Sequence, residues 1–459
     1  MTLIDGFVAL ALLAGLLGNR QPLIPITAIF LVVMRGTTGR ITHGAGFKRL
    51  EWAVVVCLSY WLLNYFWSTG DLSNLLSYDF MRHDGAFLVS YSTLVFLLGW
   101  ALSPRKCAVF WITLLCALGL IAIPGMIISL NLPLASYLYS PVQMLGLMTP
   151  DQNAGELMYL GWYEGHNTVG GVYALASLLA LTVVEQDVFG RRHRLFAWAL
   201  FAACLVGLAF SYSRGNYIAF GLGAFFVLPV RKFSHALKIG LTTVLPAVLI
   251  VLTTSSALSH IDTITDPYYG TNADRIRIWK EALGDFEDSP LIGIGFGRFN
   301  DTDLQYWGVK NIVWVATHGK IVNDDSHAHN SFLHFLAEGG VAGFAITMFV
   351  WWSAWVELSS FQRKFPRWKQ AWLLKAGKAC LIAALAESMT EHLLGRGVVV
   401  LELSALIGMT LASARAVEKA ARAAVEKRSR ALATKEASLA RPAAVQGATG
   451  RTSLGVART

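Results

Sequence analysis

The amino-acid sequence predicts an all-α integral membrane protein with about twelve transmembrane helices. Hydrophobic residues make up 55% of the 459 residues and charged residues 15%, whereas soluble domains carry about 25% charged residues. The mean hydropathy is +0.50, and much of it lies in apolar runs close to the roughly 20 residues that a membrane-spanning helix needs. These observations exclude a soluble enzyme, a disordered chain and a small disulfide-stabilised domain.

Twelve apolar runs divide residues 1–414 into a polytopic membrane domain. Lipid offers no hydrogen-bond partner to the backbone, so helices are the expected spanning structure. The first two runs are short and could instead form one re-entrant pair. The runs are residues 3–18, 22–34, 50–67, 86–103, 108–130, 168–185, 196–212, 215–230, 239–255, 330–356, 371–392 and 398–414.

The distribution of Lys and Arg sets the expected orientation of these spans. Most of the 38 basic residues fall in alternate connections and in the tail, and short loops rich in Lys and Arg stay on the cytoplasmic side. Both termini are therefore predicted to be cytoplasmic. The net charge of +9 belongs to these loops and the tail, where anionic membrane lipid is the expected partner. Nucleic acid is not expected, because the basic residues share no single surface.

Two connections on the opposite side are too long to be simple loops, residues 131–167 and 256–328. The larger one precedes the tenth span and is net acidic. We expect the chemistry of the protein on this outward side. Residues 415–459 form a basic, alanine-rich tail that is predicted to be cytoplasmic and partly helical or disordered.

The first candidate site residue is Arg214, in the sequence SYSRGN between two apolar runs. A charged side chain at the membrane boundary costs free energy unless it is paired or reaches the interface. Arg214 would stand at the start of the next helix, where free backbone N–H groups already favour an anion, with Ser213 in support. This arrangement predicts a phosphate-binding site. The alternative is an arginine that merely extends its side chain to the interface.

The second candidate region covers residues 272–300. Arg275 and Trp279 are four residues apart, so they share one face of a helix. The sequence GIGFG after Pro290 predicts a tight turn whose glycines let the backbone approach another group closely. It matches part of a dinucleotide-binding motif, but no parallel α/β unit surrounds it, so we exclude a nicotinamide site.

The third candidate region, NDDSHAHNSFLH at residues 323–334, leads into the tenth span and Glu338, a supporting residue. His329 at a helix start fits a general base or a hydrogen-bond donor, because histidine exchanges protons near neutral pH. Asn330 or Ser331 would cap the helix. A histidine with only a capping role is the simpler alternative. A divalent metal is another, although no fixed spacing favours it; the candidate ligands are Asp324, Asp325, His327 and His329.

A fourth candidate is Arg396, in the short outward turn HLLGR. Its positive charge at a membrane edge could join the same anion site as Arg214. A plain interfacial anchor is an equal alternative. Neither a metal nor an organic cofactor is expected.

The order of these motifs resembles the O-antigen ligase and polymerase superfamily of bacterial polysaccharide assembly. The resemblance covers roughly residues 160–412 and rests on SYSRGN, then Arg-x-x-x-Trp, then PLIGIGFGRF, then HAHNSFLHFLAEGGVAGF opening a long span. It implies a metal-independent glycosyltransferase of the bacterial inner membrane whose active site faces the periplasm. The donor would be a glycan on undecaprenyl diphosphate, and the acceptor a hydroxyl of the lipid A core or of a growing glycan.

The resemblance also implies roles for single residues. Arg214 resembles the arginine that contacts the diphosphate, Arg275 the loop arginine near the phosphates, and His329 the histidine that activates the acceptor. A chain polymerase of the same superfamily is the first alternative, and a lipid-linked glycan flippase or transporter a weaker one, because no internal repeat is evident. The sequence does not reveal the sugar, the acceptor, the anomeric outcome or the oligomeric state.

Overall fold

The computed structural model describes residues 3–17, 48–69, 85–99, 103–129, 131–144, 148–150, 157–159, 165–228, 270–299, 327–395 and 397–439. The chain divides into two compact units, Met1–Ser413 and Ala414–Thr459. Nearly all of the described residues are helical. The longer helices are α1 (Leu3–Leu17), α3 (Arg49–Thr69), α5 (Gly85–Leu98), α6 (Pro104–Ser129), α7 (Ala135–Met144), α8 (His166–Glu185), α9 (Arg194–Ala209), α10 (Arg214–Val227), α14 (Gly270–Asp288), α16 (Ser331–Lys364), α17 (Ala371–Glu387) and α18 (Gly397–Leu439).

A short antiparallel hairpin is the exception to the helical architecture. Its strands, β1 (Met148–Pro150) and β2 (Leu157–Tyr159), pair with Thr149 opposite Met158. Together with α7, the hairpin occupies the predicted outward connection at residues 131–167. Of the larger predicted connection, the structure describes α14 and the turn that follows it, as well as residues 327–328.

Six of the described helices are long and apolar enough to cross a membrane, namely α3, α6, α8, the helical segment with α9, α16 and α18. The shorter helices α1 and α5 also contain apolar segments. This pattern supports a multi-pass membrane protein. The predicted runs at residues 22–34 and 239–255 lie outside the described residues, and each other predicted run coincides with a helix. The total of twelve spans remains a prediction.

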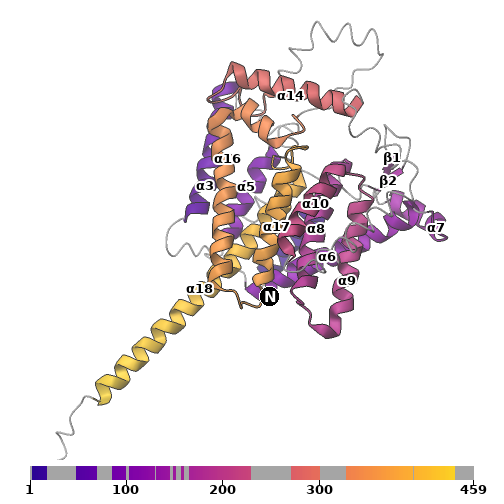
Figure 1. The fold of residues 1–459 in the computed structure, drawn as a ribbon. Helices are drawn as coiled ribbons and strands as arrows, with labels where there is room; N and C mark the ends of the chain where they lie inside the picture. The colour runs from indigo at the N-terminus through magenta and orange to yellow at the C-terminus, as the bar shows by residue number, and fades with distance from the viewer. Residues whose placement is uncertain are drawn as a thin grey trace, which may run out of the picture. The chain divides into compact units, whose positions relative to one another are not determined.

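Helix α8 is the central element of the group formed with α9, α10 and α17 (Figure 1). It is buried on all sides from Val169 to Val184, as expected for a helix that is apolar all round. Small residues allow its neighbours to approach closely. Gly207 of α9 faces the Tyr173 ring, and Gly223 of α10 faces the Leu178 side chain, so a methyl group at either position would clash.

A second group of helices contains α3, α5 and α16 (Figure 1), and α16 also packs on α17. Trp61 of α3 is fully buried, and its indole ring fills a notch beside Gly339 and Gly343 of α16. The indole N–H donates to Thr347 Oγ1 at 2.9 Å. The burial of this large ring and its satisfied hydrogen bond fix α3 against the first half of α16.

The long helix α16 is interrupted at Gly340, whose φ of 60° and ψ of −166° are not helical. The turn at residues 289–299 packs its backbone directly against this break. Ile294 N donates to Ala337 O at 2.9 Å, and Val341 N donates to Pro290 O at 2.9 Å. The turn therefore satisfies backbone groups that the interruption would otherwise leave without partners.

The glycine-rich turn has the geometry that the sequence predicts. Gly293, Gly295 and Gly297 all have positive φ angles of 72°, 119° and 75°, which favour glycine. A methyl group at Gly293 would lie 2.2 Å from the Glu338 backbone. The predicted close approach of the turn backbone to another group is thus confirmed, and the group is the backbone of α16.

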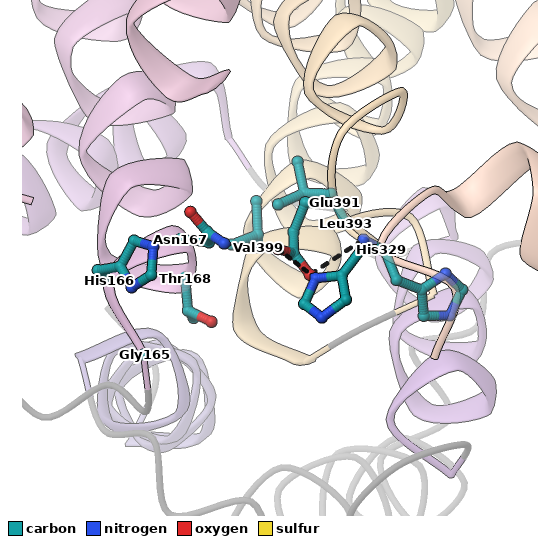
Figure 2. A pocket seen from close by; sticks show the side chains of 9 residues that line it. Gly165, His166, Asn167, Thr168, His329, Glu391, Leu393 and Val399 are labelled. Carbon is teal, nitrogen blue, oxygen red and sulfur yellow. Dashed lines mark hydrogen bonds and ion pairs between the residues drawn. The ribbon is translucent and has the colours of Figure 1, made fainter. Parts of the chain in front are cut away.

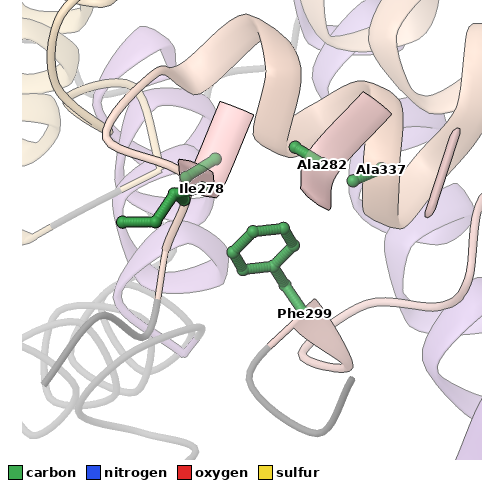
Figure 3. Close-up of a cluster of buried hydrophobic side chains, with 5 residues drawn as sticks. Ile278, Ala282, Phe299 and Ala337 are labelled. Atoms are coloured by element: carbon green, nitrogen blue, oxygen red, sulfur yellow. The ribbon is translucent and has the colours of Figure 1, made fainter. Parts of the chain in front are cut away.

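Helix α14 is attached to the start of α16 by a small cluster of buried side chains (Figure 3). Leu333 of α16 packs against this cluster from one side. Since the cluster joins α14, the turn after it and α16, it places the middle of α14 near the residues that precede α16. The cluster consists of Ile278, Ala282, Phe299, Ala328 and Ala337.

Candidate active site

A cavity of about 180 Å³ opens where three segments that are distant in sequence meet (Figure 2). The start of α8 lines one side, the residues before α16 line another, and the turn after α17 with the start of α18 completes it. Six of the lining side chains are polar and come from all three segments: His166, Asn167, Thr168, His329, Glu391 and His392.

His329 stands immediately before the cap of α16 in a left-handed conformation, with φ of 45°. Such a conformation is uncommon for a side-chain-bearing residue, although histidine tolerates it better than most. Its backbone N–H donates to His327 Nδ1 at 3.1 Å. The side chain is 22% exposed, and its Nδ1 lies 3.1 Å from Glu391 Oε2. The turn therefore projects the His329 imidazole into the cavity and against a carboxylate.

These contacts indicate where the protons of the two neutral imidazoles lie. His327 Nδ1 accepts from a backbone N–H, so its proton belongs on Nε2, which lies 3.6 Å from Glu391 Oε1. His329 Nδ1 faces the other carboxylate oxygen. Because a carboxylate oxygen only accepts hydrogen bonds, this Nδ1 carries the proton. In that tautomer, Nε2 is the basic nitrogen of His329.

The Glu391 carboxylate receives further hydrogen bonds from its surroundings. Asn167 Nδ2 donates to Oε2 at 2.6 Å, and the backbone N–H of His392 donates to Oε1 at 3.2 Å. The carboxylate side chain is only 7% exposed. Donors at both oxygens hold this buried carboxylate in one orientation.

Arg214 is the first residue of α10, as the sequence predicts, and it is exposed. Ser213 occupies the N-cap position, but its side chain makes no capping bond. Instead, Ser213 Oγ donates to Asn167 Oδ1 at 2.8 Å. Asn216 Nδ2 donates to the Asn167 backbone carbonyl at 2.9 Å. The start of α10 is thus hydrogen-bonded to the residue that also holds Glu391.

Arg275 reaches the same region from α14. Its positive charge interacts electrostatically with the Glu387 carboxylate at the end of α17. That carboxylate packs against Gly215, where a methyl group would lie 2.6 Å from Glu387 Oε2. Gly215 is the neighbour of Arg214, so Glu387 lies between the elements that carry the two arginines.

The predicted supporting residues near α16 have distinct positions. Asn330 caps the helix, because its side-chain oxygen accepts from Phe332 N and Leu333 N; the capping prediction is confirmed for Asn330.

Glu338 lies in the core beneath the cavity, with Oε1 accepting from Phe299 N at 3.1 Å and Oε2 lying 3.3 Å from His334 Nε2. It therefore braces the glycine-rich turn rather than lining the cavity. Arg396 lies outside the described residues.

The cluster also offers ligands suited to a divalent cation. One ligand atom each from His327, His329 and Glu391 lies within 4.8 Å of the others, and imidazole with carboxylate is a common ligand set for zinc. Two ligands of the predicted alternative, Asp324 and Asp325, lie outside the described residues. His329 Nδ1 and Glu391 Oε2 are hydrogen-bonded at 3.1 Å, so a cation bound to both would have to displace the proton between them.

Sequence reasoning missed Glu391 and Asn167. Glu391 follows α17 in the sequence ESMTEH, and an ionisable residue at the edge of an apolar run is a signal for a functional site. Asn167 lies in the first turn of α8, in the sequence GHNTVGG, where no local pattern distinguishes it from a residue of a helix start.

The apolar helices indicate a multi-pass membrane protein, and its cavity holds a histidine and a carboxylate suited to proton transfer, with Arg214 at the start of α10. Residues 199–348 match the family described as O-antigen ligase, so the resemblance to that superfamily is confirmed. The match contains Arg214, Arg275 and His329, whereas Asn167 and Glu391 lie beyond its ends. The family comprises membrane glycosyltransferases of the ligase and polymerase type. No curated protein matches the chain.

Proposed function

We propose that the protein transfers a glycan from an undecaprenyl-diphosphate carrier to an acceptor hydroxyl on the periplasmic side of the bacterial inner membrane, as an O-antigen ligase does with the lipid A core. One observation carries this proposal. The cavity that exposes His329 is hydrogen-bonded through Asn167 to the start of α10, where Arg214 stands. This series of contacts supports a proton acceptor and a phosphate-binding cation acting in one site.

The arginines would act on the leaving group. As the bond between the anomeric carbon and the phosphate oxygen breaks, the diphosphate leaves with the bonding electrons and its negative charge grows. Guanidinium groups and helix N-termini stabilise such charge by charge-assisted hydrogen bonds. Arg214, the backbone N–H groups of the first turn of α10 and Arg275 are the groups assigned to this task. The reaction then needs no metal.

His329 would act on the acceptor. Its Nε2 accepts the proton of the acceptor hydroxyl while that oxygen forms the new bond to the anomeric carbon. One well-placed base contributes about 10²–10⁴-fold to such a rate. Direct attack opposite the diphosphate inverts the anomeric centre, and NMR of the product that showed retention would contradict this route.

The test uses purified full-length protein in liposomes with an undecaprenyl-diphosphate glycan and an acceptor. The wild type is expected to form product, and Arg214→Ala to weaken both donor binding and transfer. Arg192→Ala, an exposed arginine at the other end of α9, is the matched control and should leave both unchanged. A wild type that moved the donor across the vesicle without forming product would replace this proposal with a flippase.

The choice between ligase and polymerase depends on the acceptor. Removing the protein from its source cell and analysing the surface polysaccharide distinguishes the two. Long chains that stay on the carrier would support the ligase, whereas products shortened to one repeat would support a polymerase of the same superfamily.

A further inference from the structure

We infer that Glu391 is the positioning residue for His329, and that Asn167 holds the Glu391 carboxylate at a fixed position relative to α10, the helix that begins with Arg214. This inference rests on the proposed function for its role in transfer. The contacts themselves come from α8, from the residues before α16 and from the turn after α17.

The first argument is the number of donors that converge on one carboxylate. Oε2 lies 2.6 Å from Asn167 Nδ2 and 3.1 Å from His329 Nδ1. Oε1 lies 3.2 Å from His392 N and 3.6 Å from His327 Nε2. Rotation of the carboxylate would break several of these contacts together. The oxygen that faces His329 is therefore fixed, and with it the tautomer that leaves Nε2 as the base.

The second argument is that hydrogen bonds of neighbouring residues join the segment around His329 to the segment around Glu391. None of these hydrogen bonds involves the side chain of His329 or of Glu391. Ser331 N donates to Ser388 O at 2.8 Å, and Asn330 Nδ2 donates to Met389 O at 3.0 Å. Ser331 Oγ also accepts from Leu394 N at 3.1 Å. The start of α16 and the turn after α17 thus form one unit, so the spacing of His329 and Glu391 does not depend on their mutual attraction.

The third argument is the orientation of the Asn167 amide. Its Nδ2 must face the Glu391 carboxylate, which only accepts hydrogen bonds, and its Oδ1 then accepts from Ser213 Oγ at 2.8 Å. Both ends of the amide are satisfied in one orientation alone. Asn167 therefore sets the distance between the carboxylate behind the base and the start of α10.

The carboxylate would assist the base in two ways during transfer. It orients the imidazole, and its negative charge stabilises the imidazolium that forms when His329 accepts a proton. The titratable and charged groups that share this environment among the described residues include His166, His327, Glu387, Glu391, His392 and, from α14, Arg275.

The experiment compares Glu391→Gln and Glu391→Asp with the wild type in the liposome assay, with EDTA present throughout. We expect Glu391→Gln to lower kcat by about 10²-fold, within the contribution of one base, with little change in donor KM. Glu391→Asp should recover part of this loss. Glu185→Gln is the matched control, because Glu185 pairs with Lys375 at 3.0 Å at the opposite end of α8, and its kcat should equal that of the wild type.

A second measurement does not depend on transfer. Modification of His329 by diethyl pyrocarbonate, followed by mass spectrometry across pH, reports when this imidazole loses its proton. Loss of the neighbouring negative charge should move the midpoint to lower pH by about one unit in Glu391→Gln, but not in Glu185→Gln. If the midpoint shifts while the wild type forms no product, Glu391 still positions His329 and only the proposed function fails.

Other outcomes overturn the inference. An unchanged midpoint together with an unchanged kcat in folded Glu391→Gln would assign the carboxylate no role in the site. Loss of wild-type transfer on EDTA treatment, restored by a divalent cation, would assign His327, His329 and Glu391 to a metal and replace the positioning role.

Discussion

Two histidine–glutamate pairs lie close to the start of α16 but differ in their surroundings. His329 and Glu391 approach to 3.1 Å with side-chain exposures of 22% and 7%. His334 and Glu338 approach to 3.3 Å with exposures of 3% and 1%. The first pair joins a left-handed turn to a distant segment beside a cavity, whereas the second joins successive turns of one helix.

The neighbours of each pair explain the difference in role. The His334 ring is enclosed by aromatic rings, with the His392 ring centroid at 3.9 Å and the Phe299 centroid at 5.3 Å. Glu338 also accepts from the backbone of the glycine-rich turn. The same two side-chain types thus form a brace where they are enclosed and a candidate acid–base site where a cavity admits a substrate.

Removal of the exposed base, His329, is expected to have the largest effect, and this effect is on the rate of glycan transfer. We predict that His329→Ala lowers the rate of glycan transfer by about 10²–10⁴-fold while donor binding and thermal stability in detergent stay close to wild type. A transfer assay with purified protein, together with a melting curve, checks both. A normal transfer rate in His329→Ala would remove His329 from the role of base.

Breaking the enclosed pair of His334 and Glu338 should lower stability and leave turnover unchanged. Glu338→Ala leaves His334 without its carboxylate and Phe299 N without its acceptor, and breaking a buried pair costs about 3–5 kcal/mol. We predict a marked drop in melting temperature. The fraction that remains folded should retain the wild-type turnover per active molecule at low temperature. Equal melting temperatures for Glu338→Ala and the wild type would mean that the pair is not a brace.

The glycine-rich turn packs so closely on α16 that a side chain at Gly293 should destabilise the protein. Gly293→Ala places a methyl group 2.2 Å from the Glu338 backbone at a φ of 72°, and a strained backbone of this kind costs about 1–3 kcal/mol. Gly284→Ala is the matched control, since nothing lies within 4 Å of the added methyl group in α14. Thermal unfolding should separate the two, with Gly284→Ala at or above wild-type stability.

The smallest expected effect concerns the cap of α16. Asn330→Ala removes the acceptor for Phe332 N and Leu333 N, and loss of such a cap costs about 1 kcal/mol. Because Asn330 follows His329, a modest decrease in transfer should accompany the lower melting temperature. Asn330→Asp keeps the accepting oxygen but loses the Nδ2 donor to Met389 O, so it is expected to restore only part of the stability.

Local features of the site were predictable because they depend on neighbouring residues. The N-terminal position of Arg214 in α10, the capping by Asn330 and the tight turn at Gly293 follow from patterns a few residues long. Glu391 could not be assigned to His329, because 62 residues separate them in the chain. Asn167 is farther still, and a hydrogen bond between side chains leaves no periodic pattern.

The sequence by itself determined the membrane class and the helical runs, since the cost of placing a polar backbone in lipid depends on composition and length alone. It also supplied the order of motifs that indicates the family. Only the tertiary structure decided that the start of α8, the residues before α16 and the turn after α17 line one cavity, and which of the two histidine–glutamate pairs faces it. Packing of small residues and buried rings sets those distances, and that packing depends on contacts among segments far apart in the chain.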